Sequence, residues 1–152
     1  MAFRSQLESR YPGLRDSDWG ITSEEDPRYN CIAFAAFDED RWWEPDPMGQ
    51  YFWPPSVPRE NTLEAFILAF ESVGYVRCED ETHEDGFHKV ALYVKANAFT
   101  HAAREHKGAL WKSKLGEDVD IVHRLDALSG RVLGRPAVFL KRSSSHPAYV
   151  PA

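Results

Sequence analysis

The sequence has few cysteines, no long apolar run and less positive than negative charge. Its 152 residues include 2 cysteines, Cys31 and Cys78, too few for the disulfide framework of a small secreted domain. The longest apolar stretches, residues 31–37 and 65–70, are far too short to span a bilayer. The first residues show neither the apolar run nor the cleavage pattern of a secretory signal. We therefore expect a cytoplasmic protein with both thiols reduced.

The negative net charge argues against some classes of binding partner, and the composition indicates a single globular domain. Lys and Arg number 18 against 24 Asp and Glu, which gives a formal net charge of -6. Nucleic acids and anionic membranes are bound through basic faces, so we expect neither as a partner. The apolar fraction of 43% is that of an ordinary globular domain. We expect a single domain over residues 1–142 and a flexible tail over 143–152, and the composition leaves the oligomeric state open.

Helices are predicted in the first half of the chain and strands in the second. Asn30 can cap a buried helix that begins at Cys31, and Asn61 or Thr62 can cap a second helix that ends before Gly74. The second helix has apolar residues at helical spacing, namely Leu63, Phe66, Ile67, Phe70 and Val73. Strands are expected at 75–78, 89–94, 100–105, 109–114, 120–123 and 137–141. Helices followed by a mostly antiparallel sheet are the α+β pattern.

Residues 41–59 form an aromatic-proline segment that fits neither a helix nor a central strand. It contains five prolines and the aromatic residues Trp42, Trp43, Tyr51, Phe52 and Trp53. Its aromatic content argues against disorder, so we expect an ordered loop packed over the domain. The rings either cover one flank of the core or line a groove for a substrate, with Trp42, Trp43 and Trp53 as the candidate binding residues.

Cys31 and His101 are the candidate catalytic pair. A cysteine in the first turn of a helix lies beside unpaired N–H groups and the positive end of the dipole, which both favour a thiolate. His101 begins a predicted strand and is followed by two small alanines, which leave room for its ring. The plainer alternative is a small core cysteine and an unrelated surface histidine. Cys78 is the weaker nucleophile because the acidic residues 79–81 that follow it disfavour a thiolate.

The spacings of the histidines do not match a metal-binding pattern, so we expect no metal and no other cofactor.

Three segments carry a resemblance to a known family. Residues 29–35 (Tyr-Asn-Cys-Ile-Ala-Phe-Ala), 100–104 (Thr-His-Ala-Ala-Arg) and 111–116 (Trp-Lys-Ser-Lys-Leu-Gly) resemble the motifs of an uncharacterised bacterial family. The likeness extends from residue 29 to about residue 141. More remotely, the arrangement resembles NlpC-type cysteine peptidases and amidases of the papain-like superfamily. Those proteins place the cysteine at a helix N-terminus and the histidine on the first strand of a hairpin, so the resemblance implies a papain-like α+β fold.

The resemblance also implies a cysteine hydrolase or transferase that acts on an amide or thioester bond, in a peptide or small amide substrate. Cys31 would be the nucleophile, His101 the general base, and Asn30 a neighbouring donor to the oxyanion hole. The family pattern departs at the residue that orients the histidine, for which Ser113, His123 and Asp120 are the candidates. The alternative function is a non-catalytic binding domain that recognises a partner protein through loop 41–59.

Overall fold

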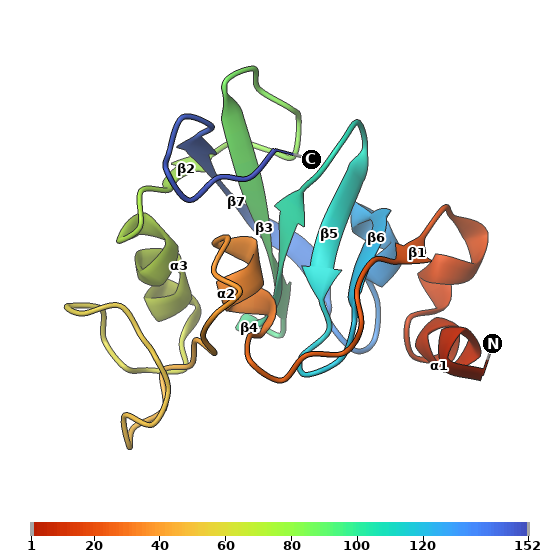
Figure 1. Cartoon of the computed structure of the whole chain (residues 1–152), viewed down its shortest axis with the longest axis horizontal. Coiled ribbons are helices and arrows are strands. Elements are labelled where there is room, and N and C mark those ends of the chain that lie inside the picture. Colours follow the sequence, from red (N-terminus) through yellow and green to blue (C-terminus); the bar gives the residue numbers. More distant parts are fainter. Residues whose placement is uncertain (1, 152) are drawn as a thin grey trace.

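Residues 2–151 are described by a computed structural model, in which a seven-stranded antiparallel sheet carries a few short helices (Figure 1). The strand order is β1-β6-β5-β4-β3-β7-β2. The strands are β1 (Gly20–Ile21), β2 (Val76–Cys78), β3 (Phe87–Lys95), β4 (Ala98–Glu105), β5 (Leu110–Lys114), β6 (Asp120–Arg124) and β7 (Arg135–Ser143). The α-helices are α1 (Ala2–Arg10), α2 (Cys31–Ala35) and α3 (Leu63–Glu71), and short 3-10 helices cover Pro12–Asp16 and Leu125–Leu128. The predicted mixture of helices and a mostly antiparallel sheet is confirmed.

The two predicted helices begin at residues whose side chains cap them. The Asn30 side chain accepts a hydrogen bond from the backbone N–H of Ala33 at 3.2 Å, which satisfies a donor in the first turn of α2. Thr62, rather than Asn61, caps α3 by accepting from the N–H of Ala65. These caps fix where each helix starts, and hence where Cys31 stands on α2.

Apolar side chains cover both faces of the sheet. On the first face, which we call the α2 face, helices α2 and α3 pack on alternate residues of β3, β4 and β7, including Leu92, Ala102 and Leu140. On the opposite face, the α1 face, α1 and the 3-10 helices pack on Tyr93, Ala103 and other residues between them. Figure 1 shows α2 crossing in front of the strands, whereas α1 lies beyond β1 and β6. A sheet buried on both sides gives strands without a polar alternation.

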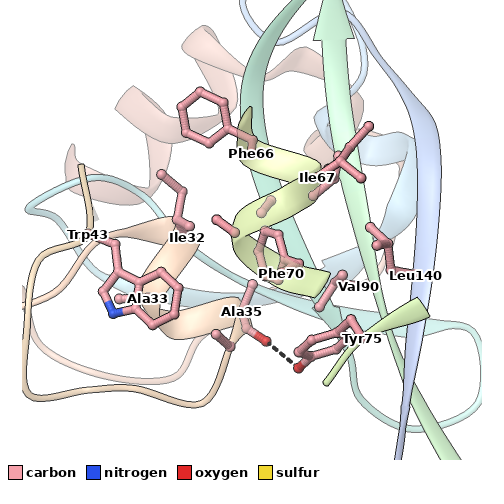
Figure 2. Packing of buried hydrophobic residues seen from close by; sticks show 14 of the residues in the cluster. Ile32, Ala33, Ala35, Trp43, Phe66, Ile67, Phe70, Tyr75, Val90 and Leu140 are labelled. Atoms are coloured by element: carbon pink, nitrogen blue, oxygen red, sulfur yellow. Dashed lines mark hydrogen bonds between the residues drawn. The ribbon is translucent and has the colours of Figure 1, made fainter. Parts of the chain in front are cut away.

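The core under α2 and α3 is built from aromatic and branched side chains. Figure 2 shows Phe70 of α3 between Ile32 of α2 and the sheet residues Val90 and Leu140, with Phe66 at the edge of the view of this cluster. Tyr75 is 1% exposed and donates its hydroxyl to the backbone carbonyl of Ala35 at 3.2 Å. This bond ties the end of α2 to the segment after α3.

The segment 144–151, which the sequence predicts as part of a flexible tail, packs back on the domain. The N–H of Ser144 bonds to the carbonyl of Gly86, and the ring of Tyr149 stacks on His88 with centroids 4.5 Å apart. The same ring meets Phe37 edge to face at 5.3 Å. The chain after β7 therefore covers one end of the sheet. Within residues 2–151 no helix has the length and apolar character needed to cross a bilayer.

Candidate functional site: two polar clusters on opposite faces of the sheet

Cys31 is the first residue of α2 and is partly exposed, but its thiol lies in apolar surroundings. Burial raises the pKa of the thiol to about 11, against the weaker opposite effect of the backbone N–H groups of Ala102 and Ile32. The positive charge of Lys114 also lowers the pKa of the thiol, with a smaller effect than the backbone N–H groups. At neutral pH the Cys31 side chain is therefore a thiol and not a thiolate.

The Asn30 side chain forms hydrogen bonds with both α2 and the aromatic loop. Its oxygen accepts from the N–H groups of Ala33 and Trp43, and its Nδ2 donates to the carbonyl of Trp43 at 2.7 Å. The residue is 6% exposed. One Nδ2 hydrogen is used in the bond to Trp43, so Asn30 joins α2 to the aromatic loop, and its role as an oxyanion donor stays a prediction.

His101, Ser113 and His123 form a buried hydrogen-bonded chain across β4, β5 and β6. The hydroxyl of Ser113 lies 2.8 Å from Nε2 of His101 and 2.7 Å from Nε2 of His123. Nδ1 of His123 lies 2.7 Å from the carbonyl of Arg124. The structure thus brings together the histidine and two of the three residues that sequence reasoning proposed to orient it.

The directions of these bonds follow from the backbone carbonyl of Arg124, which can only accept a hydrogen bond. The Arg124 carbonyl must receive a proton from Nδ1 of His123, so Nε2 of the neutral His123 ring is an acceptor. Ser113 then donates to His123 and accepts from Nε2–H of His101. Burial lowers the pKa of His101 to about 3 and that of His123 to about 4, so both rings are neutral at pH 7.

This chain lies on the face of the sheet opposite to Cys31. Neighbouring residues along a strand point to opposite faces. On β4, Ala102 belongs to the core under α2, and Arg104 donates to the Phe34 carbonyl in α2 at 2.8 Å. His101 points the other way and packs against Tyr93 on the α1 face, with ring centroids 5.3 Å apart. The sheet backbone therefore separates the expected nucleophile from the expected base.

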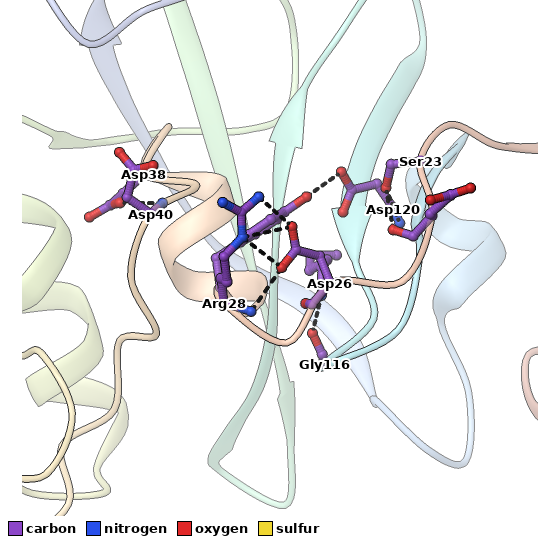
Figure 3. Close-up of polar contacts among 10 residues, drawn as sticks. Ser23, Asp26, Arg28, Asp38, Asp40, Gly116 and Asp120 are labelled. Atoms are coloured by element: carbon purple, nitrogen blue, oxygen red, sulfur yellow. Dashed lines mark hydrogen bonds and ion pairs between the residues drawn. The ribbon is translucent and has the colours of Figure 1, made fainter.

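A second polar cluster, which the sequence did not single out as a group, lies beside Cys31 on the α2 face. The hydroxyl of Tyr29 donates to Asp120 at 3.0 Å, and the ammonium of Lys114 lies 4.7 Å from the Tyr29 ring. Figure 3 shows Asp120 beside Ser23, whose hydroxyl accepts from the N–H of Asp120 at 3.1 Å. Lys114 is fully buried and donates to the carbonyls of Asp26 and Gly116, each at 2.6 Å. Burial raises the pKa of Asp120 and lowers that of Lys114. These bonds fix the segment before α2 on β5 and β6.

Loop 41–59 is ordered, and only some of its aromatic rings are accessible. Trp43 and Trp53 are 2% and 4% exposed and belong to the core, so most of each ring is covered by protein. Trp42 is half-buried, whereas Tyr51 and Met48 are exposed. The predicted ordered loop is present, and among its tryptophans Trp42 has the most accessible ring, while the substrate-binding role stays a prediction.

The loop is held in shape by its acidic and basic residues. The carboxylate of Asp46 accepts from the N–H groups of Gln50 and Tyr51, at 2.7 and 3.2 Å. Arg59 donates to the same carboxylate at 3.0 Å and to the Tyr51 carbonyl at 3.1 Å. These bonds within the loop close the tip that carries Met48 and Tyr51.

Comparison with known proteins places the chain in a family. A family model described as a domain of unknown function, DUF7689, matches residues 20–141, which include every strand from β1 to the greater part of β7. The chain belongs to this family. No curated protein and no solved structure matches the chain. Within residues 2–151, no group of three or more His, Cys, Asp or Glu side chains is arranged to hold a metal ion.

Proposed function

We propose that this DUF7689 member is a non-catalytic binding domain that recognises a partner protein through the tip of loop 41–59. The observation that carries the proposal is the placement of Cys31 and His101 on opposite faces of the sheet. A general base must come within hydrogen-bond distance of the nucleophile it activates, directly or through one water. The one feature that this fold shares with the papain-like arrangement is a cysteine at the start of a helix that packs on an antiparallel sheet.

The loop tip has the properties of a recognition surface. Met48 is 81% exposed and Tyr51 is 42% exposed, while buried Trp43 and Trp53 anchor the segment on either side. Figure 1 shows the segment projecting from the body beyond α2 and α3. A pre-ordered loop loses little conformational entropy on binding, and exposed aromatic and Met side chains are typical anchors in protein interfaces.

Alkylation of Cys31 tests the absence of a catalytic pair. With a thiol pKa of about 11, we expect slow reaction with iodoacetamide at pH 8, measured by mass spectrometry in a Cys78→Ser background. His101→Gln should change the apparent pKa by less than about 0.3 units, because the ring does not contact the thiol. Circular dichroism establishes that the variant is folded. A thiol pKa below about 8 that rises in His101→Gln would instead show a coupled pair and contradict the proposal.

Partner capture tests the role of the loop tip. The full chain is immobilised and exposed to an extract of its native host, and bound proteins are quantified by mass spectrometry. A double variant, Met48→Ser with Tyr51→Ser, should reduce recovery of the partner by about tenfold or more, as expected for central interface anchors. Val76→Ser with Val150→Ser is the matched control, because both valines are exposed and lie outside the loop. Equal losses in the two double variants would contradict recognition by the tip.

A further inference from the structure

Trp42 and Tyr51 form an accessible pair of aromatic rings on loop 41–59. Their ring centroids are 6.2 Å apart, and the ring planes are inclined by 42°. Tyr51 is 42% exposed and Trp42 is half-buried, so both residues reach the solvent. The face of an aromatic ring attracts a cation, and tryptophan does so most strongly.

Backbone pairing within the loop fixes this aromatic pair. Trp43 and Phe52 form a parallel β-bridge. The N–H of Phe52 donates to the Trp42 carbonyl at 3.2 Å, and the N–H of Glu44 donates to the Phe52 carbonyl at 3.0 Å. Beside the rings, Nε1 of Trp42 donates to Oε1 of Glu44 at 3.1 Å. The loop thus presents two rings and a carboxylate in one fixed arrangement.

Glu44 is the carboxylate of this loop that has no ion pair within the described part of the chain. Both arginines of the loop are already paired with aspartates. Arg41 lies 3.0 Å from the Asp38 carboxylate, and Arg59 lies 3.0 Å from the Asp46 carboxylate. The charge of Glu44 is left uncompensated, which favours a partner that brings a positive group to this position.

A second bonded pair of tryptophan and glutamate in the chain holds an arginine. The indole of Trp19 donates to Glu8 at 3.0 Å, and the guanidinium of Arg4 lies over the Trp19 ring at 3.9 Å. Trp42 and Glu44 repeat the bonded indole and carboxylate. Within the described residues, however, no arginine or lysine lies over the Trp42 ring. The face of this ring is therefore available to a cation from another molecule.

We propose that this site takes an arginine side chain of the partner protein, with the guanidinium over the Trp42–Tyr51 pair and its charge attracted by Glu44. The inference rests on the proposed function and adds the chemistry of the partner's anchor. Arginine matches the site better than lysine, because a planar guanidinium stacks on a ring face while its N–H groups still reach a carboxylate. The chain needs no rearrangement, since Trp42 and Glu44 are half-buried and Tyr51 is exposed.

Nuclear magnetic resonance titration of the full chain with N-acetyl-arginine amide tests the proposal, and the citrulline analogue is the neutral isostere. The arginine probe should shift the Trp42 indole N–H signal saturably and bind about threefold or more tightly than the citrulline probe. Glu44→Gln should weaken arginine binding by about threefold, while its amide oxygen still accepts from the Trp42 indole. Glu60→Gln is the matched control, because it removes an equal charge at an exposed residue and should leave affinity within about 1.5-fold.

Two variants at Tyr51 test the contribution of the second ring. Tyr51→Phe keeps the aromatic face and should hold affinity for the arginine probe within about twofold, whereas Tyr51→Leu should lower it by about threefold. Three results would each overturn the proposal: equal binding of the arginine and citrulline probes, equal effects of the Glu44 and Glu60 variants, or tighter binding of N-acetyl-lysine amide than of the arginine probe.

Partner capture distinguishes failure of this inference from failure of the proposed function. Glu44→Gln should lower recovery of the partner by about threefold relative to Glu60→Gln. If Met48→Ser with Tyr51→Ser lowers recovery but the two glutamine variants behave alike, recognition by the loop tip stands and the arginine anchor is wrong. If that double variant behaves like its valine control, recognition by the tip is itself wrong.

Discussion

Lowering the pH from 7 to 5 is expected to reduce the free energy of unfolding by about 4 kcal/mol through His101 and His123 alone. Burial holds the pKa of His101 at about 3 and that of His123 at about 4, below the ordinary value of 6.5. Between pH 6.5 and these values the unfolded chain binds protons that the folded chain does not. Stability is therefore fully present above pH 6.5 and is lost as the pH falls, by about 2 kcal/mol per histidine at pH 5.

Urea unfolding followed by tryptophan fluorescence at pH 7, 6 and 5 measures this loss. His88, whose pKa burial lowers to about 4, adds a loss of the same sign. His83 is the control of opposite sign: it is exposed and Glu105 raises its pKa, so His83→Gln should not reduce the loss between pH 7 and 5. A free energy of unfolding that is flat between pH 7 and 5 would show that these histidines titrate normally in the folded protein. A loss of this size is a large share of the stability of an ordinary domain.

Ser113→Ala is expected to destabilise the fold by about 3 kcal/mol. Ser113 is fully buried, and its hydroxyl serves two partners at once. Its removal leaves Nε2–H of His101 without an acceptor and Nε2 of His123 without a donor, and each unsatisfied buried group costs about 1–3 kcal/mol. Chemical denaturation measures the change, and Ser9→Ala at an exposed site on α1 should stay within about 0.5 kcal/mol.

A double-mutant cycle separates the hydrogen bond from simple loss of volume. Combining Ser113→Ala with His123→Phe should cost less than the sum of the two single changes, because each removes the other's partner. Additive costs, or a Ser113→Ala effect below about 0.5 kcal/mol, would contradict a stabilising role for the Ser113 hydrogen bonds.

The elements of this protein could be predicted from local patterns, because caps and apolar spacing act within a few residues. The helix over residues 63–71 and the strands within 89–94 and 137–141 were recognisable from spacing and strand-forming residues. The pairing of β3 with β7 was not, because no local pattern encodes which distant strand completes an edge.

The side of the sheet on which His101 lies was the decisive unknown. A strand with one wet face reveals its orientation by alternating polar and apolar residues. Here Ala102 and Ala103 are both completely buried, because helices and cores cover both faces. The sequence offered Ser113 as one candidate partner of His101 across the hairpin without fixing the register, and it carried no pattern that could place His101 relative to Cys31. For loop 41–59 the composition likewise predicted an ordered aromatic segment, but it did not show which of the aromatic rings are buried.

The strand order has a consequence for how the chain acquires its structure. β3 lies between β4 and β7, and β1 pairs with β6, so the meander from β3 to β6 can form early from neighbours in sequence. One edge of β3 then stays unpaired until β7, residues 135–143, has been synthesised. Likewise, β1 cannot pair until β6, about 100 residues later, is present. We expect slow folding dominated by these distant pairings, with the unpaired β3 edge exposed to aggregation during synthesis.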